Sequence, residues 1–229
     1  MELSTRLKKV ADLVEPCNCV ADIGTDHAYI PIYLVKNNIC SHAIASDINK
    51  GPVKKALLNV NSYNLQNRIE CRLGSGLNTL KTKEADTVII SGMGGNLIRD
   101  IIEDRIDLFK EFKSVILQPV QNPEVLREYI YKRGYNIIDE ELCIDENKFY
   151  EIIKIRYSEK NYNIDNIFYE ISKKLFDEKH PVIKDFIINK YNKYNKILSK
   201  INDTSELAND RKNELKIRIN KLEEMLKCL

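Results

Sequence analysis

The sequence predicts an α/β fold with a mostly parallel sheet, followed by a helical extension. Between Cys19 and about Tyr157, short apolar runs alternate with amphipathic stretches, the pattern of βαβ units whose helices cover a parallel sheet. After Tyr157 the strand signals cease and helical periodicity begins. A length of 229 residues leaves room for one such domain and a modest appendage. We therefore expect two domains, residues 1–159 and residues 160–229.

Short apolar segments predict the parallel strands, at residues 19–23, 42–47, 69–73, 86–91 and 114–119. Amphipathic stretches between them predict helices, at residues 27–37, 52–63, 96–103 and 123–132, after a first amphipathic segment at residues 3–14. Residues 135–145 and 148–158 then resemble two strands with no room for a helix between them. The prediction is a seven-stranded sheet that ends in an antiparallel hairpin, unlike a dehydrogenase sheet that stays parallel.

The extension carries two runs of apolar residues at helical spacing. They are Ile183, Ile187, Tyr191, Tyr194, Ile197 and Ile201, followed by Leu215, Ile219, Leu222, Leu226 and Leu229. Asp203, Thr204 or Ser205 offers an N-cap for the second helix. The simplest arrangement is an antiparallel, coiled-coil-like helical hairpin.

Composition narrows the class of protein. The N-terminal segment lacks the unbroken apolar stretch of a signal peptide, and no apolar run approaches the ~20 residues that span a bilayer. We therefore expect a soluble, cytoplasmic protein with no membrane association. The six cysteines lack the spacings that hold zinc or a redox disulfide, and Cys17 and Cys19 read as structural thiols. This predicts no metal.

Charge is unevenly distributed along the chain. Residues 1–159 carry 21 basic and 23 acidic side chains, whereas residues 160–229 carry 15 basic and 11 acidic ones. Between residues 179 and 200 there are six lysines and one acid, Asp185. Such a segment suits a polyanionic partner, although a solvated helix face is the simpler alternative.

The most informative segment is VADIGTDHAYIP, residues 20–31. It places Asp22 at the end of the first strand, Gly24 in the following turn, and Thr25, Asp26 and His27 at the entry to a helix. In an open α/β sheet, ligands bind beyond the carboxyl ends of the strands, where a glycine lets the backbone approach the ligand. A dinucleotide fold would have several glycines here to receive a pyrophosphate. The two carboxylates instead favour a cofactor with an ammonium and a sulfonium group, of which S-adenosylmethionine (SAM) is the common one.

Three further strand ends agree with a nucleoside cofactor. Asp47 lies 23 residues after Gly24, where an acid typically accepts hydrogen bonds from ribose hydroxyls. The glycines of LGSGL (73–77) and SGMGG (91–95) would leave an open rim for the adenine ring and for a substrate base. A tight turn without a ligand is the alternative at each glycine segment.

Taken together, DIGTDHAYIP, IASDINKGP, RLGSGL, IISGMGG, ILQP and KFYEII resemble the bacterial TrmK family of tRNA adenine-22 N1-methyltransferases. The resemblance covers roughly the whole chain, because the family also has a helical C-terminal extension. It implies a Rossmann-like methyltransferase domain that uses SAM, with tRNA as the partner and no inferable protein partner. Two residues depart from the family pattern. Ser75 stands where an acid is frequent, and Val120 stands where asparagine is usual, which weakens the expected polar contacts at both positions.

The resemblance and the loop chemistry together give the candidate site. Asp26 and Tyr29 are the candidate catalytic residues. The cofactor-binding candidates are Asp22, Gly24, Thr25, His27, Asp47, Ile48, Gly74, Ser75, Gly76, Gly92 and Met93. The substrate-binding candidates are Gly94, Gly95, Lys190, Lys193 and Lys196.

In the expected mechanism, the neutral N1 lone pair attacks the sulfonium methyl in line, so the enzyme mainly holds donor and acceptor at about 3 Å. Asp26 would stabilise the charge that develops on the adenine or accept a proton from it. A structural N-cap is the alternative for Asp26, and burial in the core is the alternative for Tyr29. His27 is expected to order the loop rather than to act as a base.

Three other functions fit parts of the sequence. A SAM enzyme acting on a small molecule would use the helical hairpin only for dimerisation. A non-catalytic RNA-binding module on the same fold would explain the Ser75 departure. A nicotinamide dehydrogenase is disfavoured by the acidic loop.

Overall fold

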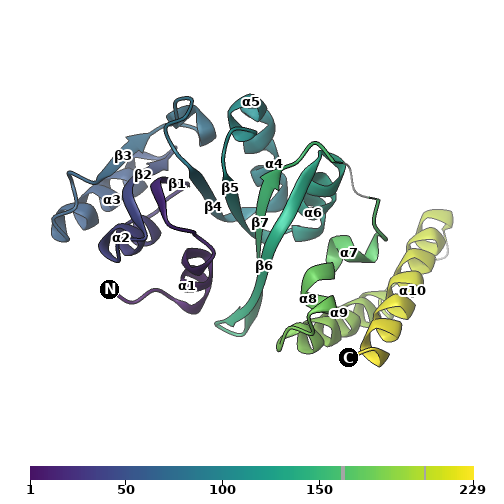
Figure 1. Cartoon of the computed structure of the whole chain (residues 1–229). Helices are drawn as coiled ribbons and strands as arrows, with labels where there is room; N and C mark the ends of the chain where they lie inside the picture. Colours follow the sequence, from purple (N-terminus) through teal and green to yellow (C-terminus); the bar gives the residue numbers. More distant parts are fainter. Residues whose placement is uncertain (161–162, 204) are drawn as a thin grey trace. The chain divides into compact units, whose positions relative to one another are not determined.

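The computed structural model describes residues 1–160, 163–203 and 205–229. The chain forms two compact units, a first unit of Met1–Ile164 and a second unit of Asp165–Leu229 (Figure 1). The sequence placed this boundary five residues earlier, directly after the last strand. Both the backbone N–H and the hydroxyl of Ser158 donate to the Gly134 carbonyl, which ties the chain after that strand to the first unit.

The first unit is built on a seven-stranded sheet of order β3-β2-β1-β4-β5-β7-β6. Strands β1 to β5 pair in parallel, whereas β7 is antiparallel to both β5 and β6, as the sequence predicted. This is the Rossmann-like methyltransferase arrangement with its terminal hairpin. The strands are β1 (Cys17–Ile23), β2 (Cys40–Asp47), β3 (Ile69–Leu73), β4 (Thr87–Gly94), β5 (Ser114–Gln121), β6 (Tyr135–Asp145) and β7 (Lys148–Tyr157).

Helices cover both faces of this sheet (Figure 1). They are α1 (Thr5–Asp12), α2 (Tyr29–Lys36), α3 (Lys50–Ser62), η1 (Gly76–Thr79), α4 (Gly95–Asp104), α5 (Ile106–Phe109) and α6 (Pro123–Lys132). One apolar core lies between the sheet and α4, α5 and α6, and the other between the sheet and α1, α2 and α3. Because side chains alternate along a strand, Ala21 and Ile23 of β1 enter the first core and Val20 enters the second.

The terminal hairpin is held to α6 by buried charges. Arg127 of α6 lies 2.8 Å from the carboxylate of Glu140 on β6 and 2.7 Å from that of Glu151 on β7. All three side chains are buried. Burial alone would lower the pKa of Arg127, but attraction to Glu140 and Glu151 outweighs it and raises the pKa. This cluster fixes the hairpin at the edge of the sheet that lies away from β1.

The second unit is helical, with α7 (Ile167–Glu170), α8 (Lys173–Asp177), α9 (Ile183–Leu198) and α10 (Glu206–Lys227). Ser205 caps α10 by accepting a hydrogen bond from the Ala208 N–H, and the expected alternative Thr204 lies outside the described residues. The Tyr191 hydroxyl of α9 donates to Glu223 of α10 over 2.8 Å. Buried Tyr194 bonds to Glu170, which also pairs with Arg218 of α10. Helix α9 therefore packs against α10, and α7 is held to both, within the predicted helical extension.

Within residues 1–160, 163–203 and 205–229, no helix has both the length and the apolar character needed to cross a bilayer.

Candidate functional site

The turn between β1 and α2 gives the site its shape. Gly24 has a φ of +79°, a left-handed conformation that strains other residues, and its N–H and that of Thr25 both donate to the Ser46 carbonyl over 2.8 Å. The Thr25 hydroxyl accepts a hydrogen bond from the N–H of Ala28, the N-cap residue of α2. These contacts fold residues 24–28 into a tight loop at the carboxyl end of β1, where ligands bind in such sheets.

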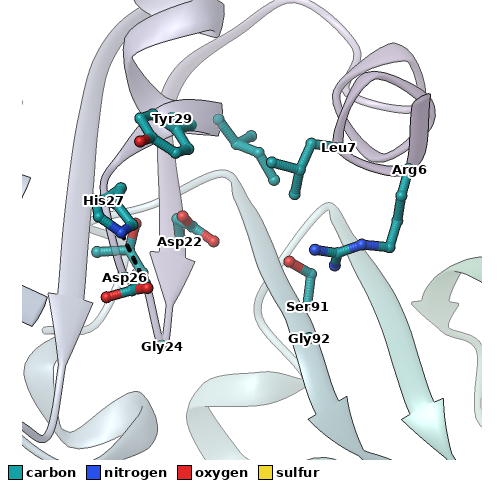
Figure 2. A pocket seen from close by; sticks show the side chains of 11 residues that line it. Arg6, Leu7, Asp22, Gly24, Asp26, His27, Tyr29, Ser91 and Gly92 are labelled. Carbon is teal, nitrogen blue, oxygen red and sulfur yellow. Dashed lines mark ion pairs between the residues drawn. The ribbon is translucent and has the colours of Figure 1, made fainter. Parts of the chain in front are cut away.

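A cavity of about 290 Å³ opens at this loop (Figure 2). It lies between β1, α2, the end of β4 and helix α1. Seven of the predicted site residues line it: Asp22, Gly24, Thr25, Asp26, His27, Tyr29 and Gly92. Four residues that the sequence analysis had not selected complete the lining: Arg6, Leu7, Ile30 and Ser91.

Asp22 is the buried acid of this cavity, with 5% of its surface exposed. Burial raises the pKa of its carboxyl from 3.8 to about 6, against the lowering effect of a hydrogen bond with Thr25, and the nearby charge of Asp47 adds to the rise. In the part of the chain that the structure describes, no basic side chain lies within ion-pair distance of Asp22. A buried carboxylate with this surplus of negative potential fits a cationic ligand group.

Asp26 lies at the exposed rim of the cavity. Its carboxylate is 3.1 Å from Nε2 of His27 and 3.4 Å from Nζ of Lys55. The alternative of a helix N-cap is wrong for Asp26, because Ala28 occupies the N-cap position and no side chain caps α2. The Asp26 carboxylate therefore does not cap the helix, and it is exposed to a ligand at the rim.

Two stacked rings form one wall of the cavity. The rings of His27 and Tyr29 are 4.9 Å apart at their centroids and nearly parallel. Tyr29 is 40% exposed, so the alternative of a core tyrosine is wrong. Figure 2 shows this aromatic wall facing Arg6 across the cavity. Exposed, ordered aromatic faces of this kind suit a planar base.

The ends of β2 and β3 lie next to the cavity without entering its lining. Oδ1 of Asp47 accepts a hydrogen bond from the Asn49 N–H over 2.7 Å, and its carbonyl accepts one from Gly74 over 2.9 Å. Ile48 is 64% exposed, and Ser75 is exposed ahead of Gly76 in η1. These candidates lie at the carboxyl ends of two neighbouring strands, and the first of these strands pairs with β1, which leads into the Asp22 loop.

The glycine segment 92–95 serves more than one purpose. The Gly92 N–H donates to Oε1 of Gln118 over 3.2 Å, and the end of the Met93 side chain occupies the space that a Cβ on Gly24 would take. Gly94 has open space on its side-chain face. Gly95 is buried, and a Cβ there would lie 2.3 Å from the Asn122 carbonyl oxygen. Close packing of α4 against the turn that follows β5 therefore already explains the glycine at position 95, whose substrate contact stays a prediction.

Arg6 is the main site residue that sequence reasoning missed. Its Nη1 donates to Oε1 of buried Gln118 over 2.6 Å, and its guanidinium lies 5.4 Å from the ring centroid of Tyr150. Figure 2 shows the side chain extending from α1 toward Ser91. Nothing in the sequence distinguished Arg6 from the other basic residues of an amphipathic helix. Val120, just beyond Gln118, is exposed and brings an apolar side chain to the end of β5.

The predicted lysines lie on α9 of the second unit. Lys193 and Lys196 are exposed, and Nζ of Lys190 lies 5.1 Å from the ring centroid of Phe186. Tyr191 bonds to Glu223 of α10 and Tyr194 to Glu170 of α7, so both tyrosines make packing contacts within the second unit, in agreement with their place in the apolar run of the sequence. Among the described residues, no group of three or more His, Cys, Asp or Glu side chains could hold a metal ion.

Comparisons with known proteins agree with the geometry of the site. A family model described as TrmK, tRNA (adenine(22)-N(1))-methyltransferase, matches residues 20–224. The tRNA (adenine(22)-N(1))-methyltransferase of Bacillus subtilis is 38% identical over 167 residues, which cover 73% of this chain and 70% of that protein. The crystal structure of the B. subtilis TrmK has a TM-score of 0.89 and 32% identity, covering 98% of this chain and 99% of its own. The structure of M. capricolum TrmK with S-adenosylhomocysteine has a TM-score of 0.86 and 32% identity, with 99% of both chains covered.

Proposed function

The chain belongs to the TrmK family of tRNA (adenine(22)-N(1))-methyltransferases, and we propose that the cavity between β1 and β4 is where its reaction takes place. The enzyme transfers a methyl group from SAM to N1 of adenine 22 in tRNA. This activity replaces the small-molecule and non-catalytic alternatives that the sequence left open. A tRNA-modifying enzyme of this kind works in the cytoplasm, which is where we place it.

The observation that carries the proposed site is the buried, unpaired carboxylate of Asp22 beside the Gly24 turn. SAM supplies an electrophilic methyl on a sulfonium centre and also carries an ammonium group, so an acidic cavity suits it and a phosphate-binding loop would not. Asp22 and the Gly24–Thr25 turn would hold the cationic amino-acid part. Asp47 would accept hydrogen bonds from the ribose, with Ile48 and the Gly74–Gly76 loop against the adenine ring.

The acceptor side of the site is the rim formed by Asp26, His27 and Tyr29. We assign Asp26 to the exocyclic amine of the target adenine, which gains positive charge as N1 is methylated. His27 and Lys55 hold the carboxylate at the rim until the base arrives. Tyr29 offers its exposed face for stacking, so that the base is held in line with the methyl donor.

Arg6 is assigned to the nucleic-acid backbone. Gln118 and Tyr150 fix its guanidinium at the edge of the cavity, which leaves the remaining N–H donors for an anionic partner. A base inside folded tRNA must leave its stack to reach such a pocket, at a cost of a few kcal/mol. Contacts to phosphate by Arg6 and by the lysines of α9 would offset that cost.

Methylation of defined transcripts tests the assignment. Purified enzyme and radiolabelled SAM are incubated with an unmodified tRNA transcript and with the same transcript carrying guanine in place of adenine 22. We expect label only in the first transcript, and nucleoside analysis should identify it as N1-methyladenosine.

Two outcomes would contradict different parts of the proposal. Labelling that survives the guanine substitution would show that another position is methylated. Absence of labelling while SAM still binds, as measured by calorimetry, would favour a non-catalytic RNA-binding protein.

A further inference from the structure

Two cysteines lie at the amino-terminal ends of β1 and β2, at the end of these strands opposite to the cofactor loop. Cys17 is the first residue of β1 and Cys40 is the first residue of β2, and the two are directly paired in the parallel register. Their Sγ atoms are 3.0 Å apart. This contact could not be predicted from the sequence, because the two cysteines are 23 residues apart and form no recognised spacing.

The backbone at this pair is compatible with a disulfide. Neighbouring strands lie about 4.8 Å apart, and disulfides join Cα atoms that are about 4.4–6.8 Å apart. The two sulfur atoms need to approach by only about 1 Å to reach a bond length of about 2.05 Å. Rotation of the two side chains is enough, and the strands need not move.

The two thiols differ in exposure and reactivity. Cys17 is partly exposed and lines a second cavity, of about 230 Å³, together with Lys113, Arg156 and Asp86. Cys40 is buried, with 1% of its surface exposed. Their shared hydrogen bond lowers the pKa of Cys17 and raises that of Cys40. Cys17 is thus the accessible nucleophile, and Cys40 is placed to resolve a bond formed at Cys17.

The other cysteines have a different character. Burial raises the pKa of Cys19, Cys71 and Cys143 to about 11 in each case, which suppresses their thiolates. Cys228 is exposed in the second unit. Of the six cysteines, only Cys17 and Cys40 have their thiols within hydrogen-bond distance of one another.

We propose that Cys17 and Cys40 are a dithiol site that exchanges with low-molecular-weight disulfides such as glutathione disulfide and becomes a reversible intrachain disulfide. The Cys17 thiolate attacks one sulfur of glutathione disulfide, which forms a mixed disulfide and releases one glutathione thiolate. Cys40 gives up its proton and attacks Sγ of Cys17, which releases the second glutathione. Two protein thiols are oxidised, and one glutathione disulfide is reduced to two thiols.

The position of this site gives the bond a structural consequence. A Cys17–Cys40 disulfide closes the segment that contains β1, the Gly24 turn, Asp26, Tyr29 and α2. The oxidised and reduced enzymes would share the same cavity, with its loop covalently closed in one of them. The inference does not depend on methyl transfer, and its test therefore uses thiol chemistry alone.

The test is a redox titration of the full chain in a Cys228→Ser background, which removes the exposed thiol. The native protein is equilibrated with mixtures of reduced and oxidised glutathione, quenched with acid, alkylated and digested with trypsin. Cleavage after Lys9, Lys36 and Lys50 places Cys17 on residues 10–36 and Cys40 on residues 37–50. We expect these two peptides to become linked, with the loss of two alkylatable thiols, and to separate again after reduction.

Matched variants assign the roles. Cys40→Ser should leave Cys17 carrying one glutathione as a stable mixed disulfide, whereas Cys17→Ser should leave Cys40 unmodified. Cys19→Ser, on the same strand, should still give the linked peptides. The proposal is overturned if the unmutated pair keeps both thiols in oxidised glutathione, if Cys17 stops at the mixed disulfide with Cys40 free, or if the link forms through Cys19.

Discussion

The buried acid at the end of β1 and the buried acids of the terminal hairpin have different surroundings. Glu140 and Glu151 both face Arg127, at 2.8 and 2.7 Å. Asp22 has a hydrogen bond with Thr25 and the unfavourable charge of Asp47, with no cation within ion-pair distance among the described residues. The hairpin cluster is complete within the protein, whereas the Asp22 carboxylate has no cationic partner among the described residues, although Arg6 lines the same cavity.

This difference separates a structural charge from a functional one. A buried ion is costly unless it is paired, so a fold retains an unpaired one where a ligand completes it. The hairpin acids stabilise the native arrangement because Arg127 is present in the folded protein itself. In the proposed site, the ionised Asp22 carboxylate destabilises the free protein and would become favourable only when SAM binds. The following predictions test this distinction, in order of decreasing effect.

Removing Arg127 should give the largest loss of stability. Arg127→Met removes the guanidinium that both buried carboxylates face, and we expect the free energy of unfolding to fall by about 3–5 kcal/mol. Urea denaturation at neutral pH measures this loss. Replacing all three members together (Arg127→Met, Glu140→Leu and Glu151→Leu) should be far less harmful, because no unpaired charge remains. A triple variant as unstable as the single one would show that the charges do more than neutralise each other.

Asp22→Asn should have the opposite effect on stability. A pKa raised from 3.8 to about 6 means that the ionised carboxyl costs the folded state about 3 kcal/mol. The variant should therefore be more stable by up to about 3 kcal/mol at pH 7.5, while SAM binding is lost. Below pH 6 the folded wild-type protein takes up the proton before the unfolded chain does, so the difference should shrink and vanish near pH 4. Equal stability of the two proteins at pH 7.5 would contradict a cost of ionisation at Asp22.

Asp26→Asn separates catalysis from cofactor binding at the same loop. If Asp26 stabilises charge on the adenine, we expect kcat to fall about 100-fold while the Kd for SAM stays near the wild-type value. Single-turnover methylation and calorimetry give the two quantities. Lys55→Met is the matched control, since it removes a partner of Asp26 and keeps the carboxylate. Normal turnover by Asp26→Asn would remove the proposed role.

The loop shows how far sequence reasoning could go. The acids, the Gly24 turn and the strand order follow from local periodicity and motif chemistry, so the carboxyl end of β1 could be identified without coordinates. The capping alternative for Asp26 could not be excluded from its residue type and position, because it depends on the left-handed φ of Ala28 and on the Thr25 hydroxyl. The same loop is held by the N–H groups of Gly24 and Thr25, which both donate to the Ser46 carbonyl.

Long-range contacts were beyond sequence reasoning for a different reason. Arg6 reaches Gln118 across 112 residues of sequence, and no periodic pattern encodes such a pairing. Gly95 looked like a ligand-facing glycine because it belongs to a glycine cluster, but its nearest constraint is the Asn122 carbonyl of the neighbouring turn. In both cases the sequence showed the chemistry of the residue type but not the residue that it contacts.

The affinity for SAM should depend on pH through Asp22. Because the pKa of this carboxyl is about 6 in the free protein, the cation-binding form is dominant above that pH and is lost below it. Between pH 7.5 and pH 5, we expect the Kd for SAM to rise about tenfold, in proportion to the loss of the ionised form. Calorimetry over this range checks the trend. Asp26→Asn should keep the same pH dependence. An affinity that does not change with pH in the wild-type protein would show that Asp22 does not bind the cofactor.

The smallest effect concerns unpaired charges that water already solvates. Among the described residues of the second unit, Lys221 pairs with Asp165 at 2.7 Å, whereas Lys193 and Lys196 are exposed without an ion pair. Lys193→Ala and Lys196→Ala should each weaken tRNA binding a few-fold and reduce the salt dependence of log K by about one, while Lys221→Ala changes the slope less. Filter binding between 50 and 200 mM salt measures this salt dependence. Equal slopes of log K against log salt for the three variants would mean that the unpaired lysines are merely solvated. On a surface, unlike in a core, an unpaired charge carries no folding cost, so only its response to salt can show that a polyanion uses it.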